Sequence, residues 1–251
     1  MIISDNLRDK FRVWGRSAVL FSGGYDSEVL LRLAAEVLGI KDVISLTADT
    51  PLLAGFYRNH IQRVVKTLGI QSIFVEIDML EVDEFTRNSE KRCYFCKKEM
   101  YRRLKEEAYN RGCRTVMDGT STDDLNEHRP GLVAAGEAGI IHPFVEAGMG
   151  RIKISEFGYF LGALKHPSDS CLATRIPAGV RIESGLLALI EEMEAPLRPF
   201  VKGRFRVTIL EDRLLVNYSS VDEKLIAENL NRMTKISDKS GYDIELRRQD
   251  S

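Results

Sequence analysis

Six consecutive residues, Ser22-Gly23-Gly24-Tyr25-Asp26-Ser27, have the composition of a loop that binds phosphate. The apolar run 18–21 precedes them, and the apolar spacing of a helix follows. This order predicts a strand, a tight glycine turn and the N-terminus of a helix. Backbone N–H groups and the positive end of the helix dipole then converge on one point, which suits a phosphate anion. A Walker A loop is excluded because no lysine follows the glycines.

Three of the four cysteines are spaced as ligands of a metal or a cluster. Cys93 and Cys96 form a Cys-x-x-Cys pair, and Cys171 makes a natural third ligand. Two cysteines alone cannot close a structural zinc site, which usually has four ligands. Thiolate-rich sites favour iron–sulfur clusters, and three thiolates leave one iron open for an exogenous sulfide or a substrate. Cys113 precedes an apolar strand, so we expect it to be a buried structural residue.

Apolar strands alternate with helices over the first two-thirds of the chain. The pattern predicts strands at 19–21, 43–47, 72–77 and 115–117, and helices at 27–38, 53–68, 96–110 and 152–164. Glycines follow three of these helices, at Gly39, Gly69 and Gly112. We therefore predict an α/β fold, a parallel sheet with helices on both faces. Ligands of such sheets bind at the carboxyl ends of the strands. The loops 22–27, 48–51, 78–96 and 118–129 fall there.

The pattern changes near residue 180. Helices are predicted at 185–193 and 221–233, a hairpin over 204–210 and 213–218, and a last strand at 242–247. These elements indicate a small α+β domain. We place the first domain at 1–180 and the second, for substrate binding or oligomerisation, at 181–251.

Charge and hydropathy exclude several classes of partner. The 251 residues have a formal net charge of −1, so no global electrostatic bias points to nucleic acid or to membrane. No apolar run approaches the length of about 18 residues that a membrane span needs. The N-terminus lacks the apolar stretch of a secretory signal. We expect a cytoplasmic protein that binds neither nucleic acid nor membrane, with its cysteines reduced or bound to metal.

The glycine loop resembles the PP-loop of the N-type ATP pyrophosphatases, the adenine nucleotide alpha hydrolase-like fold. In that family ATP is split between its α and β phosphates, and AMP passes to an oxygen of the acceptor. The resemblance implies that the pyrophosphate half is held by Ser22, Gly23, Gly24, Asp26 and Ser27. Asp26 would act with Mg²⁺, which prefers carboxylate and phosphate oxygens. Thr47 and Ala48, at the end of the second strand, would hold adenine through the backbone.

The order of the motifs along the chain is similar to that of the LarE family. After the PP-loop come the segments 92–98, 118–120, 123–124, 129–132, 171–177 and 204–206. The resemblance implies an ATP-dependent sulfurtransferase for the nickel-pincer nucleotide cofactor. ATP adenylates a carboxylate of pyridinium-3,5-biscarboxylic acid mononucleotide, and a sulfur nucleophile displaces AMP to leave a thiocarboxylate. The physical reason is that a carboxylate resists nucleophiles whereas an acyl-adenylate does not.

The resemblance also implies one of two sulfur sources. In one type, a single cysteine at the position of Cys171 gives up its own sulfur. In the other, three cysteines hold a 4Fe-4S cluster whose open iron carries an extra sulfide. This chain has all three, Cys93, Cys96 and Cys171, and we therefore favour the cluster type.

Other roles are carried over position by position. Lys97 would assist catalysis beside the cluster motif, and Thr120 and Asp124 would contact the nucleotide or its metal. The anionic substrate would be bound by four arginines, Arg129, Arg175, Arg204 and Arg206. We predict that Arg204 and Arg206 alternate on a strand and point to one face. The resemblance further implies a homo-oligomer.

Two other classes of function remain open from the residues. PP-loop enzymes that thiolate tRNA also combine adenylation with three-cysteine clusters, but they usually carry zinc modules or RNA-binding domains, for which this chain has no equivalent motifs. A nucleotide- or metal-binding carrier without activity is the other class. It would have no need of an intact Ser-Gly-Gly-x-Asp-Ser loop.

Overall fold

The computed structural model describes residues 5–126, 130–165 and 170–249. Its contacts divide the chain into two compact units. The described part of the first unit comprises residues 5–50, 57–77, 93–126 and 130–165. The second comprises residues 51–56, 78–92 and 170–249. Each unit therefore takes chain from more than one stretch of the sequence.

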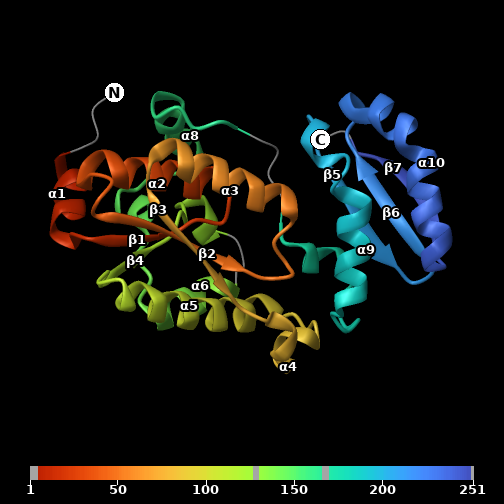
Figure 1. Cartoon of the computed structure of the whole chain (residues 1–251), viewed down its shortest axis with the longest axis horizontal. Helices are drawn as coiled ribbons and strands as arrows, with labels where there is room; N and C mark the ends of the chain where they lie inside the picture. The colour runs from red at the N-terminus through yellow and green to blue at the C-terminus, as the bar shows by residue number, and fades with distance from the viewer. Residues whose placement is uncertain (1–4, 127–129, 166–169, 250–251) are drawn as a thin grey trace. The chain divides into compact units, whose positions relative to one another are not determined.

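A parallel sheet forms the centre of the first unit, as predicted (Figure 1). Its described strands are β1 (Ser17–Leu20), β2 (Val43–Asp49), β3 (Gln71–Glu76) and β4 (Thr115–Met117), in the order β3-β2-β1-β4. In the register, Ser17 lies opposite Val43 on one side and Thr115 on the other. All four residues of β1 are buried, and Ala18, Val19 and Leu20 are apolar without alternation, as expected for a strand that is covered on both faces.

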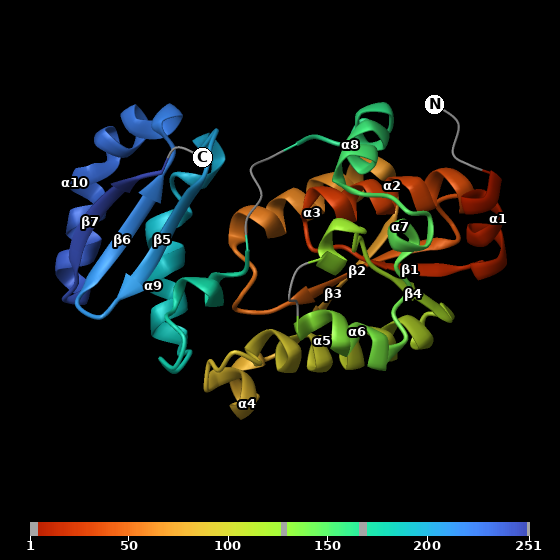
Figure 2. The same ribbon diagram turned by 180° about the vertical axis from the view of Figure 1, so that it is seen from behind.

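Helices cover both faces of this sheet, and Figures 1 and 2 show them from opposite sides. The helices α2 (Tyr25–Leu38), α3 (Gly55–Leu68) and α8 (Arg151–Phe160) lie on one face. The helices α5 (Arg92–Asn110) and α6 (Pro130–Ala138) lie on the other. On this second face, Leu104, Ala108 and Ala134 pack against Ala18 and Val116 in one buried apolar cluster. The first unit also contains the helices α1 (Asp5–Trp14) and α7 (Pro143–Glu146), whereas α4 (Asp83–Thr86) belongs to the second unit.

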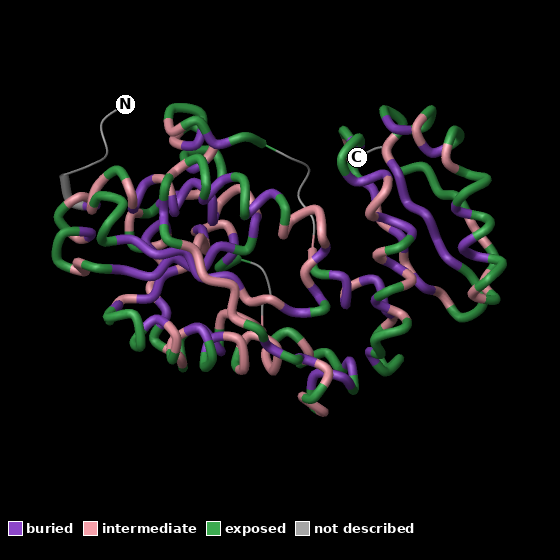
Figure 3. The backbone as a smooth tube through the Cα atoms, viewed as in Figure 1, coloured by how far each residue is buried: buried purple, intermediate pink, exposed green. Residues whose placement is uncertain are grey.

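The second unit is built on a small mixed sheet. Strand β5 (Phe205–Leu210) is antiparallel to β6 (Arg213–Tyr218), which is parallel to β7 (Asp243–Arg248). Helix α9 (Ser184–Glu194) contacts β5, and α10 (Glu223–Ser240) contacts β6 and β7. Alternate residues of β5 are buried, whereas β6 is buried along most of its length (Figure 3). This unit confirms the predicted small α+β fold.

Several bounds differ from the predicted ones for local reasons. Helix α8 ends at Phe160 rather than continuing to residue 164, because Gly162 adopts a φ of +70°. Helix α10 runs on to Ser240, since Ile236 and Ser237 continue its buried face and Gly241 ends it. The prediction that Arg204 lies on a strand is wrong, because β5 begins at Phe205.

The segment 78–92 joins the second unit through a buried asparagine. Asn88 has a φ of +54° and no exposed surface. Its amide nitrogen donates to the carbonyl oxygens of Pro177 at 2.7 Å and Val180 at 2.8 Å. The N–H of Ile182 donates to the carbonyl oxygen of Thr86 at 2.8 Å. These bonds join the segment 78–92 to residues on both sides of the expected boundary near residue 180.

Candidate active site

The glycine loop 22–27, called the phosphate loop below, joins β1 to α2. Gly23 has a φ of +82°, and a Cβ there would lie 3.2 Å from Ile61 Cγ1 and 3.3 Å from Tyr57 Cβ. Only glycine fits this position without strain. The Ser22 and Ser27 hydroxyl oxygens are 3.2 Å apart, and Ser27 Oγ donates to the carbonyl oxygen of Gly24 at 2.8 Å. The loop is therefore closed upon itself at the N-terminus of α2, where the helix dipole favours an anion.

The end of β2 lies directly beside this loop. The Phe21 N–H donates to the carbonyl oxygen of Leu46 at 2.9 Å, and Thr47 Oγ1 donates to the carbonyl oxygen of Phe21 at 2.8 Å. The Thr47 hydroxyl thus stabilises the start of the loop, and Ala48 is half-buried one residue further. Their expected contact with adenine stays a prediction.

The turn after β4 also meets the phosphate loop. A Cβ on Gly119 would lie 2.7 Å from Ser27 N and 2.8 Å from the carbonyl carbon of Asp26. The backbone of this turn therefore packs directly on the first turn of α2, so glycine is required here by close approach. Three of the predicted site residues, Asp26, Ser27 and Thr120, are thereby brought to one edge of the sheet.

Asp118, one residue before that glycine, is the centre of a hydrogen-bonded group. Its carboxylate accepts from Tyr101 Oη at 3.0 Å and from the Thr120 N–H at 3.0 Å, and His142 Nδ1 lies 2.7 Å away. Burial raises the pKa of Asp118, but His142, the charge of Lys97 and the Thr120 N–H outweigh it and lower the pKa to about 2. Burial raises the pKa of Tyr101 to about 12. The sequence motif contained Asp118 but did not reveal Tyr101 or His142 as its partners.

Asp124 is buried and closes a local turn. Its carboxylate accepts from the N–H of Ser121 at 2.8 Å and its hydroxyl at 2.9 Å, and Arg151 Nη2 lies 3.2 Å away. Its expected contact with nucleotide or metal stays a prediction. Arg129, the other predicted residue of this stretch, lies outside the described residues.

The cysteines of the Cys-x-x-Cys pair lie in the first two turns of α5. Three residues apart on a helix, Cys93 and Cys96 share one face. Cys93 is exposed, and Cys96 Sγ is half-buried 3.4 Å from Met100 Sδ. Lys97 Nζ lies 5.3 Å from the centre of the Tyr101 ring. Cys113 is fully buried, which confirms its expected structural position, and burial raises the pKa of its thiol.

Cys171 belongs to the second unit, where it is exposed at the start of the short 3-10 helix Leu172–Arg175. All four cysteines are described, and each carries a thiol rather than a disulfide. The donor set of Cys93, Cys96 and Cys171 fits the chemistry of a cluster, because two thiols share a helix face and two of the three are exposed. Within the described ranges, no three His, Cys, Asp or Glu side chains gather as a metal site. The three-cysteine ligand set stays a prediction.

The described arginines of the predicted substrate site take different positions. Arg175 has no exposed surface and binds Glu194, with Nε 3.3 Å from Oε1 and Nη2 3.3 Å from Oε2. It also donates to the carbonyl oxygen of Cys171 at 3.0 Å. Such burial is typical of a structural residue, and its expected role as an anion ligand stays a prediction. Arg206 is half-buried, whereas Arg204 is exposed.

Two of these arginines meet at the residue before Cys171. Arg175 Nη1 donates to Ser170 Oγ at 2.9 Å, and Arg206 Nη2 donates to the same oxygen at 3.0 Å. The two guanidinium groups therefore hold in place the residue that precedes Cys171.

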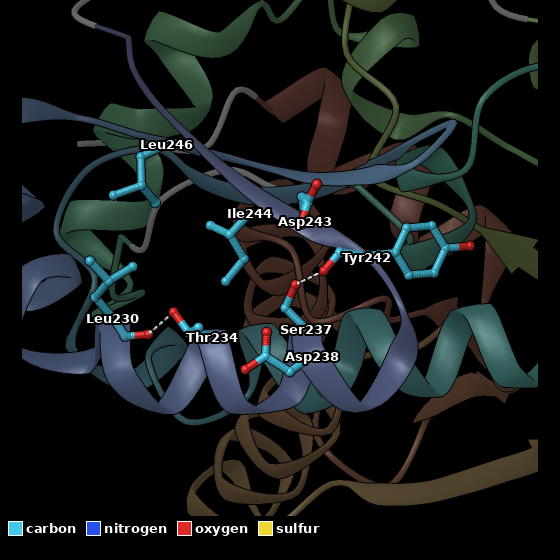
Figure 4. A pocket seen from close by; sticks show the side chains of 8 residues that line it. All are labelled: Leu230, Thr234, Ser237, Asp238, Tyr242, Asp243, Ile244 and Leu246. Atoms are coloured by element: carbon cyan, nitrogen blue, oxygen red, sulfur yellow. Dashed lines mark hydrogen bonds between the residues drawn. The ribbon is translucent and has the colours of Figure 1, made fainter.

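One cavity lies away from all of these residues. It has a volume of about 340 Å³ between α10 and β7 (Figure 4). Its lining residues are Leu230, Thr234, Ser237, Asp238, Tyr242, Asp243, Ile244 and Leu246. None of the described site residues predicted from the sequence lines it, so it does not belong to the candidate site. Among the described residues, every helix is too short or too polar to cross a bilayer.

Comparison with known proteins identifies the family. An uncharacterized protein of Synechocystis is 32% identical over 205 residues, which cover 81% of this chain and 76% of that protein. An uncharacterized protein of Methanocaldococcus jannaschii is 30% identical over 236 residues, 94% of this chain and 90% of the relative. Pyridinium-3,5-bisthiocarboxylic acid mononucleotide synthase of Lactiplantibacillus plantarum is 31% identical over 196 residues, 76% of this chain and 71% of the synthase. No family model matches the chain.

The fold and the site define an α/β protein with a glycine loop at the carboxyl edge of a parallel sheet and a second unit built on a mixed sheet. The chain belongs to the LarE family, the family of the pyridinium-3,5-bisthiocarboxylic acid mononucleotide synthase.

Proposed function

We propose that this protein is an ATP-dependent sulfurtransferase that converts a carboxylate of pyridinium-3,5-biscarboxylic acid mononucleotide to a thiocarboxylate. The observation that carries the proposal is the 31% identity to the synthase named for the bisthiocarboxylic product. The closed phosphate loop at the carboxyl edge of the sheet supports the use of ATP.

In the first step, an oxygen of the substrate carboxylate attacks the α-phosphorus of ATP. The bond from this phosphorus to the bridging oxygen of the β-phosphate breaks, and pyrophosphate leaves. The residues 22–24 and Ser27 hold the pyrophosphate, and Asp26 would hold Mg²⁺. Lys97 supplies a positive charge near Asp118, whose pKa it helps to lower. The product is an acyl-adenylate, and a sulfur nucleophile then displaces AMP.

Cys93, Cys96 and Cys171 would hold a 4Fe-4S cluster in this proposal. Bound by three thiolates, such a cluster supplies sulfide at the iron that has no protein ligand. The shared helix face of Cys93 and Cys96 favours this arrangement over one in which Cys171 gives up its own sulfur, since that route needs no second cysteine. Arg204 and Arg206 supply positive charge for the phosphate of the mononucleotide.

Pyrophosphate release tests the activity. Anaerobically prepared protein with ATP and Mg²⁺ should release pyrophosphate on addition of the pyridinium mononucleotide and not on addition of tRNA. Asp26→Asn should reduce the rate by about 100-fold, because it removes a charged ligand of the metal and its phosphates. Pyrophosphate release that depends on tRNA instead would overturn the proposed substrate.

Iron content tests the cluster separately. After anaerobic reconstitution we expect about four irons per chain. Cys93→Ala should reduce this to a trace while leaving ATP binding unchanged, and Cys113→Ala, the matched control at the buried thiol, should retain the iron. Wild-type protein without iron, in which turnover converts Cys171 to dehydroalanine, would instead establish the sacrificial route.

A further inference from the structure

The group around Asp118 has no role in the proposed chemistry. It joins four parts of the first unit: the end of β4, helix α5 through Tyr101, the turn after β4 through Thr120, and the start of α7 through His142. The side chains of Asp118 and His142 are 15% and 18% exposed. A carboxylate that is largely removed from water and has three partners is costly to assemble unless all of them are in place. The group therefore fixes the turn at the end of β4 in one position.

That turn is in direct contact with the phosphate loop. The bond from the Thr120 N–H to Asp118 Oδ1, 3.0 Å long, closes the chain around Gly119. The Gly119 backbone then lies so close to Asp26 and Ser27 that a single added carbon would be 2.7 Å from Ser27 N. If the turn is displaced, the first turn of α2 must move with it, because the two backbone segments are in contact with no flexible side chain between them. The position of Asp118 therefore decides where the first turn of α2 can lie.

We propose that Asp118 is a positioning residue for the phosphate loop. Its carboxylate, bonded to Tyr101, His142 and the Thr120 N–H, holds the turn 118–120 against the N-terminus of α2 and thereby keeps Asp26 and Ser27 in the geometry that binds ATP. The inference rests on the proposed binding of ATP by this loop. It extends that proposal to a residue which touches neither the phosphate nor the reacting atoms.

Two variants test separately the charge of the Asp118 carboxylate and one of its hydrogen bonds. Asp118→Asn keeps the shape of the side chain and removes its charge. Tyr101→Phe removes the hydroxyl that donates to Asp118 and keeps the ring beside Lys97. Tyr94→Phe is the matched control on the same helix, because the Tyr94 hydroxyl donates at 2.9 Å to an exposed carboxylate, that of Glu137, away from the turn.

Equilibrium binding of ATP with Mg²⁺, measured by calorimetry without the pyridinium substrate, is the first readout. We expect Asp118→Asn to weaken binding by about tenfold to 100-fold, since small displacements of a phosphate site are costly. Tyr101→Phe should weaken it by about fivefold, the effect of one hydrogen bond. Tyr94→Phe should bind as tightly as the wild type.

Amide hydrogen exchange over residues 20–30 of the nucleotide-free protein is the second readout. Faster exchange of this segment in Asp118→Asn and Tyr101→Phe, but not in Tyr94→Phe, supports the positioning role. If Asp118→Asn does not fold, the Tyr101→Phe variant alone tests the positioning role of Asp118. Wild-type binding of ATP and wild-type exchange in the folded variants would overturn the inference and leave the proposed function standing. If the wild type binds no ATP, the proposed function fails, and the exchange of residues 20–30 still supports or overturns the positioning of the loop.

Discussion

Individual buried charges in this chain are held by several partners at once. Glu194 is 1% exposed and binds Arg175 and Arg198, and it accepts from the N–H of Val207 at 2.7 Å. Asp118 in the first unit is only partly buried, but it too is held by three partners, Tyr101, His142 and the Thr120 N–H. Such groups stabilise the fold only while every partner remains, because a buried charge left alone carries its full desolvation cost.

Glu194→Gln should destabilise the second unit. The substitution keeps the size of the side chain but leaves two buried guanidinium groups without their carboxylate, which costs about 3 kcal/mol. Thermal unfolding followed by circular dichroism should show a lower midpoint. Asp83→Asn is the control, because its partners Arg87 and Arg181 lie on the surface and the midpoint should hardly change. Equal midpoints for Glu194→Gln and the wild type would contradict this account of the cluster.

The stability that Asp118 contributes should depend on pH in the acid range. Its pKa is about 2 in the folded protein, whereas an aspartate in an unfolded chain has a pKa of about 3.9. The folded state therefore binds the proton less readily. The contribution, about 2 kcal/mol, is fully present above about pH 4 and is lost as the pH falls toward 2.

Urea unfolding of the wild type and of Asp118→Asn at several pH values measures this effect. The difference in free energy of unfolding between the two proteins should shrink as the pH falls from about 4 toward 2. A difference that persists unchanged at pH 2.5 would show that the charge of Asp118 is not its source.

At the scale of elements, the site depends on where strand ends meet a helix N-terminus. The end of β2 meets the start of the loop after β1 through Thr47 and Phe21, and the turn after β4 meets the first turn of α2 through Gly119. The parallel arrangement explains this, since the carboxyl ends of parallel strands lie at one edge of the sheet. Glycine is needed in this region both because the elements pack closely and because a turn requires its backbone conformation.

Gly119→Ala should therefore disturb the phosphate loop. The added carbon would lie 2.7 Å from Ser27 N, so the turn or the start of α2 must move. We expect ATP binding to weaken by about 100-fold. Gly136→Ala is the control. This glycine lies within α6 with no atom within 4 Å of the added carbon, and alanine there should stabilise the helix by up to about 1 kcal/mol. Unaltered ATP affinity in Gly119→Ala would mean that the loop tolerates displacement.

At the scale of the whole molecule, the chain leaves and re-enters each unit. The second unit takes in residues 51–56 and 78–92, and the latter segment ends at Arg92, directly before Cys93. Asn88 is the residue that binds this segment to the stretch 176–182. Arg92, within the second unit, donates to Asn88 Oδ1 at 2.6 Å and to the carbonyl oxygen of Ala173 at 3.1 Å.

Asn88→Ala should loosen the second unit more than the first. Alanine leaves without a donor the carbonyl oxygens that the amide group of Asn88 bonds, and it fits poorly at a φ of +54°. Together these effects should lower the free energy of unfolding by about 3 kcal/mol. Amide exchange should accelerate over residues 78–92 and 172–182 and should remain unchanged in β1–β4. Asn229→Ala, which removes one bond within α10, serves as the control. Equal acceleration in both units would contradict the assignment of Asn88 to the second.

Local periodicity and short motifs were enough to predict the alternation of strands and helices, the parallel sheet, the glycine loop and the resemblance to the family. The sequence also predicted that Cys113 is buried. Which distant residues contact one another is visible only in the folded chain. The partnership of Asp118 with Tyr101 and His142, the burial of Arg175 against Glu194, and the contact of Gly119 with Ser27 join residues 17 to 92 positions apart. The hydrophobic periodicity of the sequence does not predict such pairs, because they depend on how the packed elements are placed in space. The physical reason is that a buried charge is stable only where the whole fold supplies its partners.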